Sequence, residues 1–97
     1  MRPSEALKLH RDEIREIFGK SELANPRIFG SVLHGEDIEG SDLDILVDLG
    51  PQGASLFYFS RLERELEGLL GVKVDLRTPQ ELCLRIRKTV VTEAQPL

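Results

Sequence analysis

Asp42 and Asp44 stand two residues apart in a segment of alternating apolar and acidic residues. Residues spaced by two on a β-strand point to the same face, so both carboxylates are expected to project together. Neighbouring carboxylates repel each other at neutral pH, and a bound cation relieves that repulsion. Ligand sets made only of oxygen favour a hard ion such as Mg²⁺ or Mn²⁺, which binds one or two carboxylates together with phosphate oxygens. The pair therefore predicts a metal site for phosphate chemistry.

Gly30 and Ser31 lie directly after a short predicted strand, and Ser31 stands eleven residues before Asp42. A glycine lets a ligand approach the main chain closely. The Ser31 hydroxyl and the N–H groups of a following helical turn can hold phosphate oxygens. We therefore expect Gly30 and Ser31 to bind phosphate beside the metal site. The simpler alternatives are an N-cap role for Ser31 and a turn role for Gly30.

Asp75 is a third candidate, in a later predicted strand over residues 72–77. Its side chain alternates onto the same face as those of Lys73 and Arg77, away from the apolar residues of that strand. Three carboxylates can hold two metal ions, one at the leaving phosphate and one at the attacking oxygen. The alternative is a surface ion pair between Asp75 and Lys73 or Arg77.

Apolar periodicity predicts the elements that position these residues. Helical spacing favours helices over 4–18 and 55–70, and a helix from the Thr78-Pro79 start to about residue 93, with one or two helical turns over 31–35. Alternation favours strands over 27–29, 42–49 and 72–77. The order predicts an α+β fold, a small mixed β-sheet backed by helices.

Size and charge narrow the function classes. The 97 residues fit one domain over 1–97, and the net charge of −4 disfavours direct nucleic-acid binding and an anionic membrane surface. The single cysteine, Cys83, excludes an internal disulfide and a cysteine-based zinc site. We find no signal peptide and no apolar run of membrane-spanning length, so we expect a soluble cytoplasmic protein. A domain this small gains stability from a homodimer or a heteromeric complex.

The spacing of Gly30, Ser31, Gly35, Ser41, Asp42 and Asp44, followed by Asp75, closely resembles the nucleotidyltransferase signature of the DNA polymerase β superfamily. The chain looks like a minimal nucleotidyltransferase (MNT) domain over nearly its whole length. Such domains form toxin–antitoxin pairs with helical HEPN proteins. The combined motif is specific, whereas any part of it alone is weak.

The resemblance implies a polymerase β-like core and a role for each candidate residue. Asp42, Asp44 and Asp75 are implied to be catalytic and to bind Mg²⁺, two ions in the full site, with Asp75 also helping to activate the acceptor hydroxyl. Gly30 and Ser31 are implied to hold the triphosphate of ATP. The implied reaction transfers AMP to a tyrosine of a HEPN toxin, so that the MNT protein acts as the antitoxin.

One position departs from the family pattern. Where many members carry a basic residue before the second glycine, this chain has His34, a weaker phosphate contact because a histidine is mostly neutral at pH 7. The alternative function is therefore a binding module that blocks its partner by occlusion. Transfer to a small molecule ranks lower, since nothing in the sequence resembles a substrate domain.

Overall fold

The computed structural model describes all residues, 1–97, as three α-helices, one short 3₁₀-helix and four strands. The helices are α1 (Pro3–Gly19), α2 (Leu56–Leu70), η1 (Pro79–Glu81) and α3 (Leu84–Glu93). The strands are β1 (Leu23–Phe29), β2 (Leu43–Leu49), β3 (Val74–Arg77) and β4 (Gln95–Pro96). This is the α+β fold with a small mixed sheet that the sequence predicts.

The strands form one sheet in the order β3-β2-β1-β4. β1 pairs with β2 and with β4 in antiparallel fashion, whereas β2 and β3 are parallel. A parallel pair needs a crossover, and α2 supplies it. The helix starts at the N-cap Ser55 and ends at Gly71, whose left-handed backbone (φ 71°) suits glycine.

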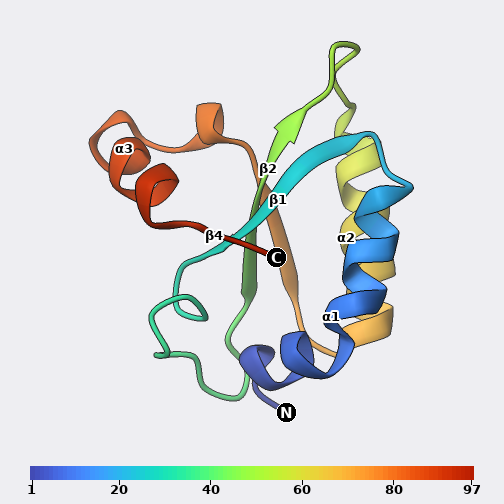
Figure 1. Cartoon of the computed structure of the whole chain (residues 1–97), viewed down its shortest axis with the longest axis vertical. Helices are drawn as coiled ribbons and strands as arrows, with labels where there is room; N and C mark the ends of the chain where they lie inside the picture. Colours follow the sequence, from blue (N-terminus) through green and yellow to red (C-terminus); the bar gives the residue numbers. More distant parts are fainter.

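α1 and α2 pack side by side on one face of the sheet (Figure 1). The core lies in this interface and combines the inward faces of both helices with those of three strands. Leu43, Ile45 and Val47 of β2 are fully buried there, as the alternation of the sequence predicts. The partner stripe of α2 consists of Leu62, Leu66 and Leu70.

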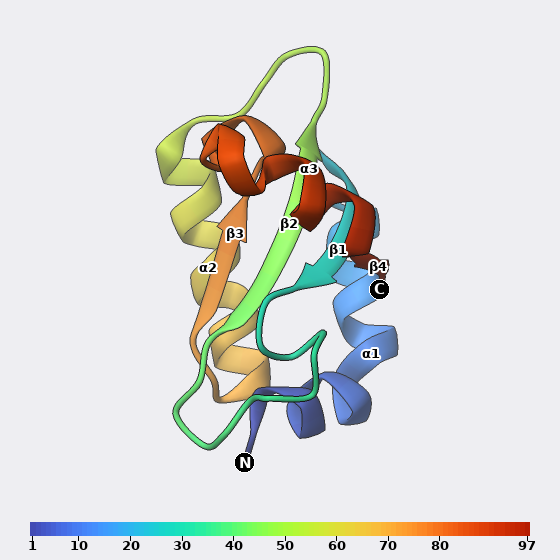
Figure 2. The same ribbon diagram turned by 90° about the vertical axis from the view of Figure 1, so that its left-hand side faces the viewer.

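The opposite face of the sheet has a different cover. α3 lies in front of its upper part, and the connection from β1 to β2 runs below, at the end of the sheet where β2 begins (Figure 2). Register places Asp44 of β2 and Asp75 of β3 on this face, because Ile45 and Leu76, the residues that follow them, belong to the core on the other side. The candidate carboxylates therefore lie opposite the helical core.

The structure corrects several predicted boundaries. β1 starts at Leu23 rather than residue 27, and an irregularity between Ala24 and Arg27 accommodates the left-handed Asn25 (φ 53°). Residues 31–35 form turns and no helix. The predicted last helix is split: the capping box of Thr78 and Glu81 forms as expected, but it begins only a 3₁₀ turn.

The split follows from the local backbone. Leu82 and Cys83 are extended, and α3 begins after them. Arg87 of α3 donates to the carbonyl oxygens of Gln80 and Leu82, which fixes the helix against this break. α3 has no buried residue, and its Leu84 and Ile86 side chains are exposed. None of the helices has both the length and the apolar character needed to cross a membrane.

Candidate active site

Asp44 and Asp75 are direct partners across the parallel pair β2–β3. Asp42 precedes β2 by one residue, and the intervening Leu43 donates its N–H to Lys73 O at 2.8 Å, which holds the start of β2 against the chain leading into β3. The predicted strand alternation thus brings Asp44 and Asp75 together, and Asp42 lies near enough to influence the charge of Asp44.

The half-buried Asp44 is the electrostatic centre of this group. Burial and, after it, the negative charges of Asp75 and Asp42 together raise the pKa of Asp44 from 3.8 to about 6, against an opposing effect of the Arg77 charge. Burial and the two neighbouring negative charges disfavour the ionised carboxylate of Asp44. A divalent cation at this place would therefore relieve repulsion that the fold has already built in.

Gly30 is packed directly against Asp44. Its backbone is left-handed (φ 77°), and a Cβ atom built at Gly30 would collide with Asp44 Oδ2 and lie 3.1 Å from Asp44 Cγ. Any larger residue would have to displace the carboxyl group. The absence of a side chain at Gly30 thus leaves space for the Asp44 carboxyl group, in addition to allowing the close ligand approach that the sequence predicts.

The turn after Gly30 presents main-chain donors. His34 N–H donates to Gly30 O at 3.3 Å and Glu36 N–H donates to Ser31 O at 2.9 Å, which closes the turn. The N–H groups of Ser31, Val32 and Leu33 form no hydrogen bond within the chain. Successive main-chain N–H groups of this kind make an anion-binding concavity, even though the turn is not a helix.

Asp75 is engaged by a cation in this structure. Its Oδ1 lies 3.1 Å from Arg77 Nε, and Arg77 Nη1 lies 3.7 Å from Glu81 Oε2. The adjacent negative charge of Asp75 is the main cause that raises the pKa of the Arg77 guanidinium. The Asp75–Arg77 ion pair is the alternative role that the sequence allows for Asp75, and it forms beside Asp44 and Asp42.

The three candidate aspartates offer the kind of ligand atoms that a hard divalent cation prefers. Asp42, Asp44 and Asp75 supply only carboxylate oxygens, and burial together with the charges of Asp75 and Asp42 raises the pKa of Asp44. No three His, Cys, Asp or Glu side chains are grouped in this structure as a ready-made metal site. The three-carboxylate metal site therefore stays a prediction, with a donor set that fits Mg²⁺.

Asp37 is a positioning residue that sequence reasoning missed. It is buried in the connection between Ser31 and Asp42, and its Oδ2 accepts from Ser4 N–H at 2.9 Å, in the first turn of α1. Burial alone would raise the pKa of Asp37, but the hydrogen bonds from Ser4 and the charge of Arg2 outweigh it and hold the pKa below 3.8. Its partner lies 33 residues away, so no local pattern reveals the contact.

Three other polar residues have structural partners. His34 Nε2 lies 3.3 Å from Glu93 Oε2, which links the turn after Gly30 to the end of α3. Asp48 Oδ1 accepts from the buried Arg27 Nη2 at 2.8 Å and is therefore a paired group rather than a solvated strand end. The Tyr58 hydroxyl accepts from Glu22 N–H at 2.7 Å.

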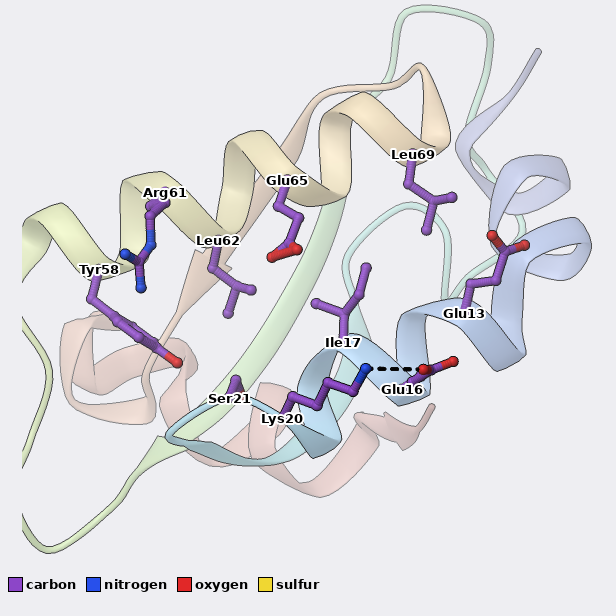
Figure 3. A pocket seen from close by; sticks show the side chains of 10 residues that line it. All are labelled: Glu13, Glu16, Ile17, Lys20, Ser21, Tyr58, Arg61, Leu62, Glu65 and Leu69. Atoms are coloured by element: carbon purple, nitrogen blue, oxygen red, sulfur yellow. Dashed lines mark hydrogen bonds and ion pairs between the residues drawn. The ribbon is translucent and has the colours of Figure 1, made fainter.

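A separate cavity lies between α1 and α2, on the helical layer (Figure 3). Glu16 of α1 and Lys20, which directly follows α1, face Tyr58 and Arg61 of α2 across it. None of the candidate carboxylates lines this cavity. It is therefore distinct from the site on the opposite face of the sheet.

Comparison with known proteins decides the family. The model of the nucleotidyltransferase domain matches residues 7–97. A protein adenylyltransferase of Thermococcus cleftensis, MntA, is 46% identical over 87 residues, which cover 90% of this chain and 84% of the relative. The chain belongs to the nucleotidyltransferase family. The matched residues include Asp42 and Asp44.

Solved structures agree with this assignment. A minimal nucleotidyltransferase has a TM-score of 0.82 and 40% identity, over 97% of this chain and 95% of the other. A toxin–antitoxin complex with AMP-PNP has a TM-score of 0.66 and 25% identity, over 97% of this nucleotidyltransferase and 71% of the matched chain. A complex of tri-AMPylated Shewanella oneidensis HEPN toxin with MNT antitoxin shares the fold, with a TM-score of 0.65, 22% identity and coverage of 92% and 69%.

Proposed function

We propose that this nucleotidyltransferase transfers AMP from ATP to a hydroxyl group of a partner protein, a tyrosine of a HEPN toxin, and so acts as an antitoxin. The observation that carries the proposal is the packing of Gly30 against Asp44, which joins the donor-rich turn to the carboxylates. The naming of a 46% identical relative as a protein adenylyltransferase supports the choice of reaction.

Each residue has a role in this reaction. The N–H groups of the turn from Ser31 to Leu33 and the Ser31 hydroxyl bind oxygens of the triphosphate, with Gly30 giving the close approach. Asp42, Asp44 and Asp75 hold Mg²⁺, two ions in the full site. When bound, Mg²⁺ supplies charge neutralisation for the phosphates. Asp75 also accepts a hydrogen bond from the acceptor hydroxyl.

The chemistry is an in-line displacement at the α-phosphorus of ATP. The bond from the acceptor oxygen to this phosphorus forms, the bond to the bridging oxygen of pyrophosphate breaks, and pyrophosphate leaves with the electron pair. No side chain forms a covalent bond to the nucleotide. Positioning and electrostatic stabilisation therefore supply the catalysis.

Labelled nucleotides test which bond breaks. ATP labelled at the α-phosphate should label the partner protein, whereas ATP labelled at the γ-phosphate should not. The Asp42→Asn/Asp44→Asn variant should abolish the α-label while it leaves the fold intact, because asparagine keeps the size of aspartate and loses its charge. Label arriving from the γ-phosphate would contradict the reaction.

The same variant separates catalysis from occlusion. Leu56 and Phe57, at the start of α2, are 86% and 88% exposed, and such apolar side chains suit a protein contact. Under the occlusion function, the double variant would still neutralise the toxin fully. Under the proposed transfer, it would bind the toxin without neutralising it.

A further inference from the structure

The outward side of α1, opposite its buried residues, carries an acidic stripe. The exposed residues there follow helical spacing, and they are Glu5, Leu9, Asp12 and Glu16. The Asp12 side chain is 99% exposed, and Leu9 is 65% exposed between the acidic residues. This stripe therefore combines negative charge with one apolar side chain that nothing in the chain covers.

The outward side of α2 carries a basic stripe with matching spacing. The exposed residues opposite its buried stripe are Phe57, Arg61, Arg64 and Gly68. Neither Arg61 nor Arg64 forms an ion pair within the chain. The Arg61 guanidinium carbon lies 5.5 Å from the centre of the Tyr58 ring, a contact that restricts where this cation can lie. Two guanidinium groups are thus presented to a partner.

A hollow lies at the N-terminal end of the basic stripe. It is lined by Ser55, Phe57, Tyr58, Arg61 and Arg64. The two guanidinium groups suit a carboxylate side chain, because arginine binds carboxylates through parallel N–H donors. In a chain whose net charge is −4, this hollow is a local basic surface that selects an acidic one.

The acidic stripe of α1 and the basic stripe of α2 match each other in order and length. If α1 of one copy is laid antiparallel on α2 of another, the facing pairs are Leu9 with Gly68, Asp12 with Arg64, and Glu16 with Arg61. Each of these stretches spans about 10 Å of helix, at a rise of 1.5 Å per residue. Gly68 leaves room for Leu9, since no atom of the chain lies within 4 Å of a Cβ built at Gly68.

A two-fold axis parallel to the helices brings the stripes together twice. Such an axis keeps the direction of each helix and exchanges the places of α1 and α2, so α1 of each copy faces α2 of the other. Because α1 and α2 run antiparallel and side by side within the chain, the facing helices are antiparallel as well (Figure 1). An unrelated acidic partner would cover the basic stripe and meet the acidic stripe of α1 beside it. A second copy matches both stripes.

We propose that the outward face of α1 and α2 is the contact surface of a symmetric dimer of this chain, with each acidic stripe packed on the basic stripe of the other copy. The ion pairs already present on α1 leave this contact possible. Asp12 lies 3.7 Å from Arg15, and Glu16 lies 3.1 Å from Lys20. Exposed pairs of this kind contribute little, and each carboxylate has oxygen lone pairs left for a second donor.

The cavity between α1 and α2 lies within this contact. Glu13 and Glu65 line it together with Lys20 and Arg61, so both signs of charge meet near the axis. An interface built mainly from exposed charges is screened by salt, and the dimer should dissociate as the salt concentration rises. The candidate carboxylates lie on the opposite face of the sheet and stay free in both copies.

Charge exchange tests the pairing. In Arg61→Glu/Arg64→Glu both stripes are acidic, and in Asp12→Lys/Glu16→Lys both are basic. Sedimentation equilibrium at low salt should show a dimer for the wild type, and each variant alone should raise the dissociation constant by at least about tenfold. Mixing the two variants makes both contacts complementary again, so a mixed dimer should form.

The matched control is Arg85→Glu/Lys88→Glu, which makes the same change in net charge as Arg61→Glu/Arg64→Glu at exposed positions of α3. This control should dimerise as the wild type does, and an unchanged circular dichroism spectrum should show that every variant folds. A monomeric wild type at low salt, a mixture that stays monomeric, or equal loss of dimer in the α3 control would each overturn the proposal. A monomeric wild type whose binding to the HEPN-type partner is lost in Arg61→Glu/Arg64→Glu would assign the basic stripe to that partner instead.

Discussion

The backbone of Gly30 lies so close to the Asp44 carboxyl group that any side chain at residue 30 would have to displace that group. The two residues lie fourteen positions apart in sequence and belong to the ends of adjacent antiparallel strands, where Phe29 pairs with Asp44. This contact ties the phosphate-binding turn to the carboxylates. The geometry of each half of the site therefore depends on the other.

Gly30→Ala should disrupt both halves. The left-handed backbone alone costs an alanine about 1–2 kcal/mol of folding stability. The new methyl group would also push the Asp44 carboxyl aside, so the rise in Tm on adding Mg²⁺ and ATP should be lost. Thermal unfolding with and without these ligands measures both effects.

Gly53→Ala is the matched control for this substitution. Gly53 has a similar left-handed backbone (φ 70°), but no atom lies within 4 Å of a Cβ built there. Its alanine variant should lose comparable stability and keep the ligand-induced rise in Tm. If Gly30→Ala kept the full ligand-induced rise in Tm, the result would contradict the claim that ligand binding depends on the close packing of Gly30 against Asp44.

The raised pKa of Asp44 predicts a pH dependence for the metal-free protein. Because the folded state raises this pKa from 3.8 to about 6, it binds the proton more tightly than the unfolded chain does. The contribution of Asp44 to the free energy of unfolding should therefore fall as the pH rises through this interval and level off above it. Asp44→Asn should remove this fall.

Urea denaturation in EDTA, at pH values on either side of the interval, measures this dependence. Above it, Asp44→Asn should be more stable than the wild type, because it removes a carboxylate that burial and the charges of Asp75 and Asp42 disfavour. Added Mg²⁺ should stabilise the wild type and not the variant. If the stability of the wild type did not fall relative to that of the variant across this range, the result would contradict the claim that burial and neighbouring charges disfavour the ionised Asp44.

Asp37 predicts a stability effect far from any reacting atom. Asp37→Ala leaves Ser4 N–H without its partner and should cost about 1–3 kcal/mol at neutral pH. Asp37→Asn keeps an acceptor oxygen and should cost less. Since the folded state lowers the pKa of Asp37, the wild-type advantage should persist at neutral pH and disappear as the pH falls below 3.8.

Glu39 provides the comparison for Asp37. It lies in the same connection, but its side chain is 80% exposed and its partner is the N-terminal ammonium group. An exposed pair of this kind contributes little, so Glu39→Ala should leave the urea midpoint almost unchanged. Equal midpoints for the alanine variants of Asp37 and Glu39 would show that the buried contact does not stabilise the protein.

Local patterns predicted the elements that carry the candidate residues. The alternation over residues 42–49 predicted both the strand and the buried side of Leu43, Ile45 and Val47, because one face of that strand packs on the core. The helix predicted over residues 55–70 agrees with α2, for which Ser55 is the N-cap and Gly71 the C-cap. The adjacency of Asp44 and Asp75 followed from the face that each strand presents, and the parallel register confirms it.

Features that depend on distant partners were not predicted. β4 has only two residues, too few for a periodic pattern, and it pairs with Arg27 and Ile28, about seventy residues earlier in the sequence. The left-handed Asn25 lets β1 extend past a proline that normally breaks a strand. The Asp37–Ser4 contact and the Gly30–Asp44 contact join segments whose proximity only the tertiary fold reveals.

The central claim is that Asp42 and Asp44 support transfer of AMP to a partner protein. Its most direct test is the intact mass of the HEPN-type partner after co-expression with the wild type or with Asp42→Asn/Asp44→Asn. The account predicts a mass increase by whole AMP units with the wild type and an unmodified partner with the variant. An unmodified partner in a stable, neutralised complex with both proteins would contradict it.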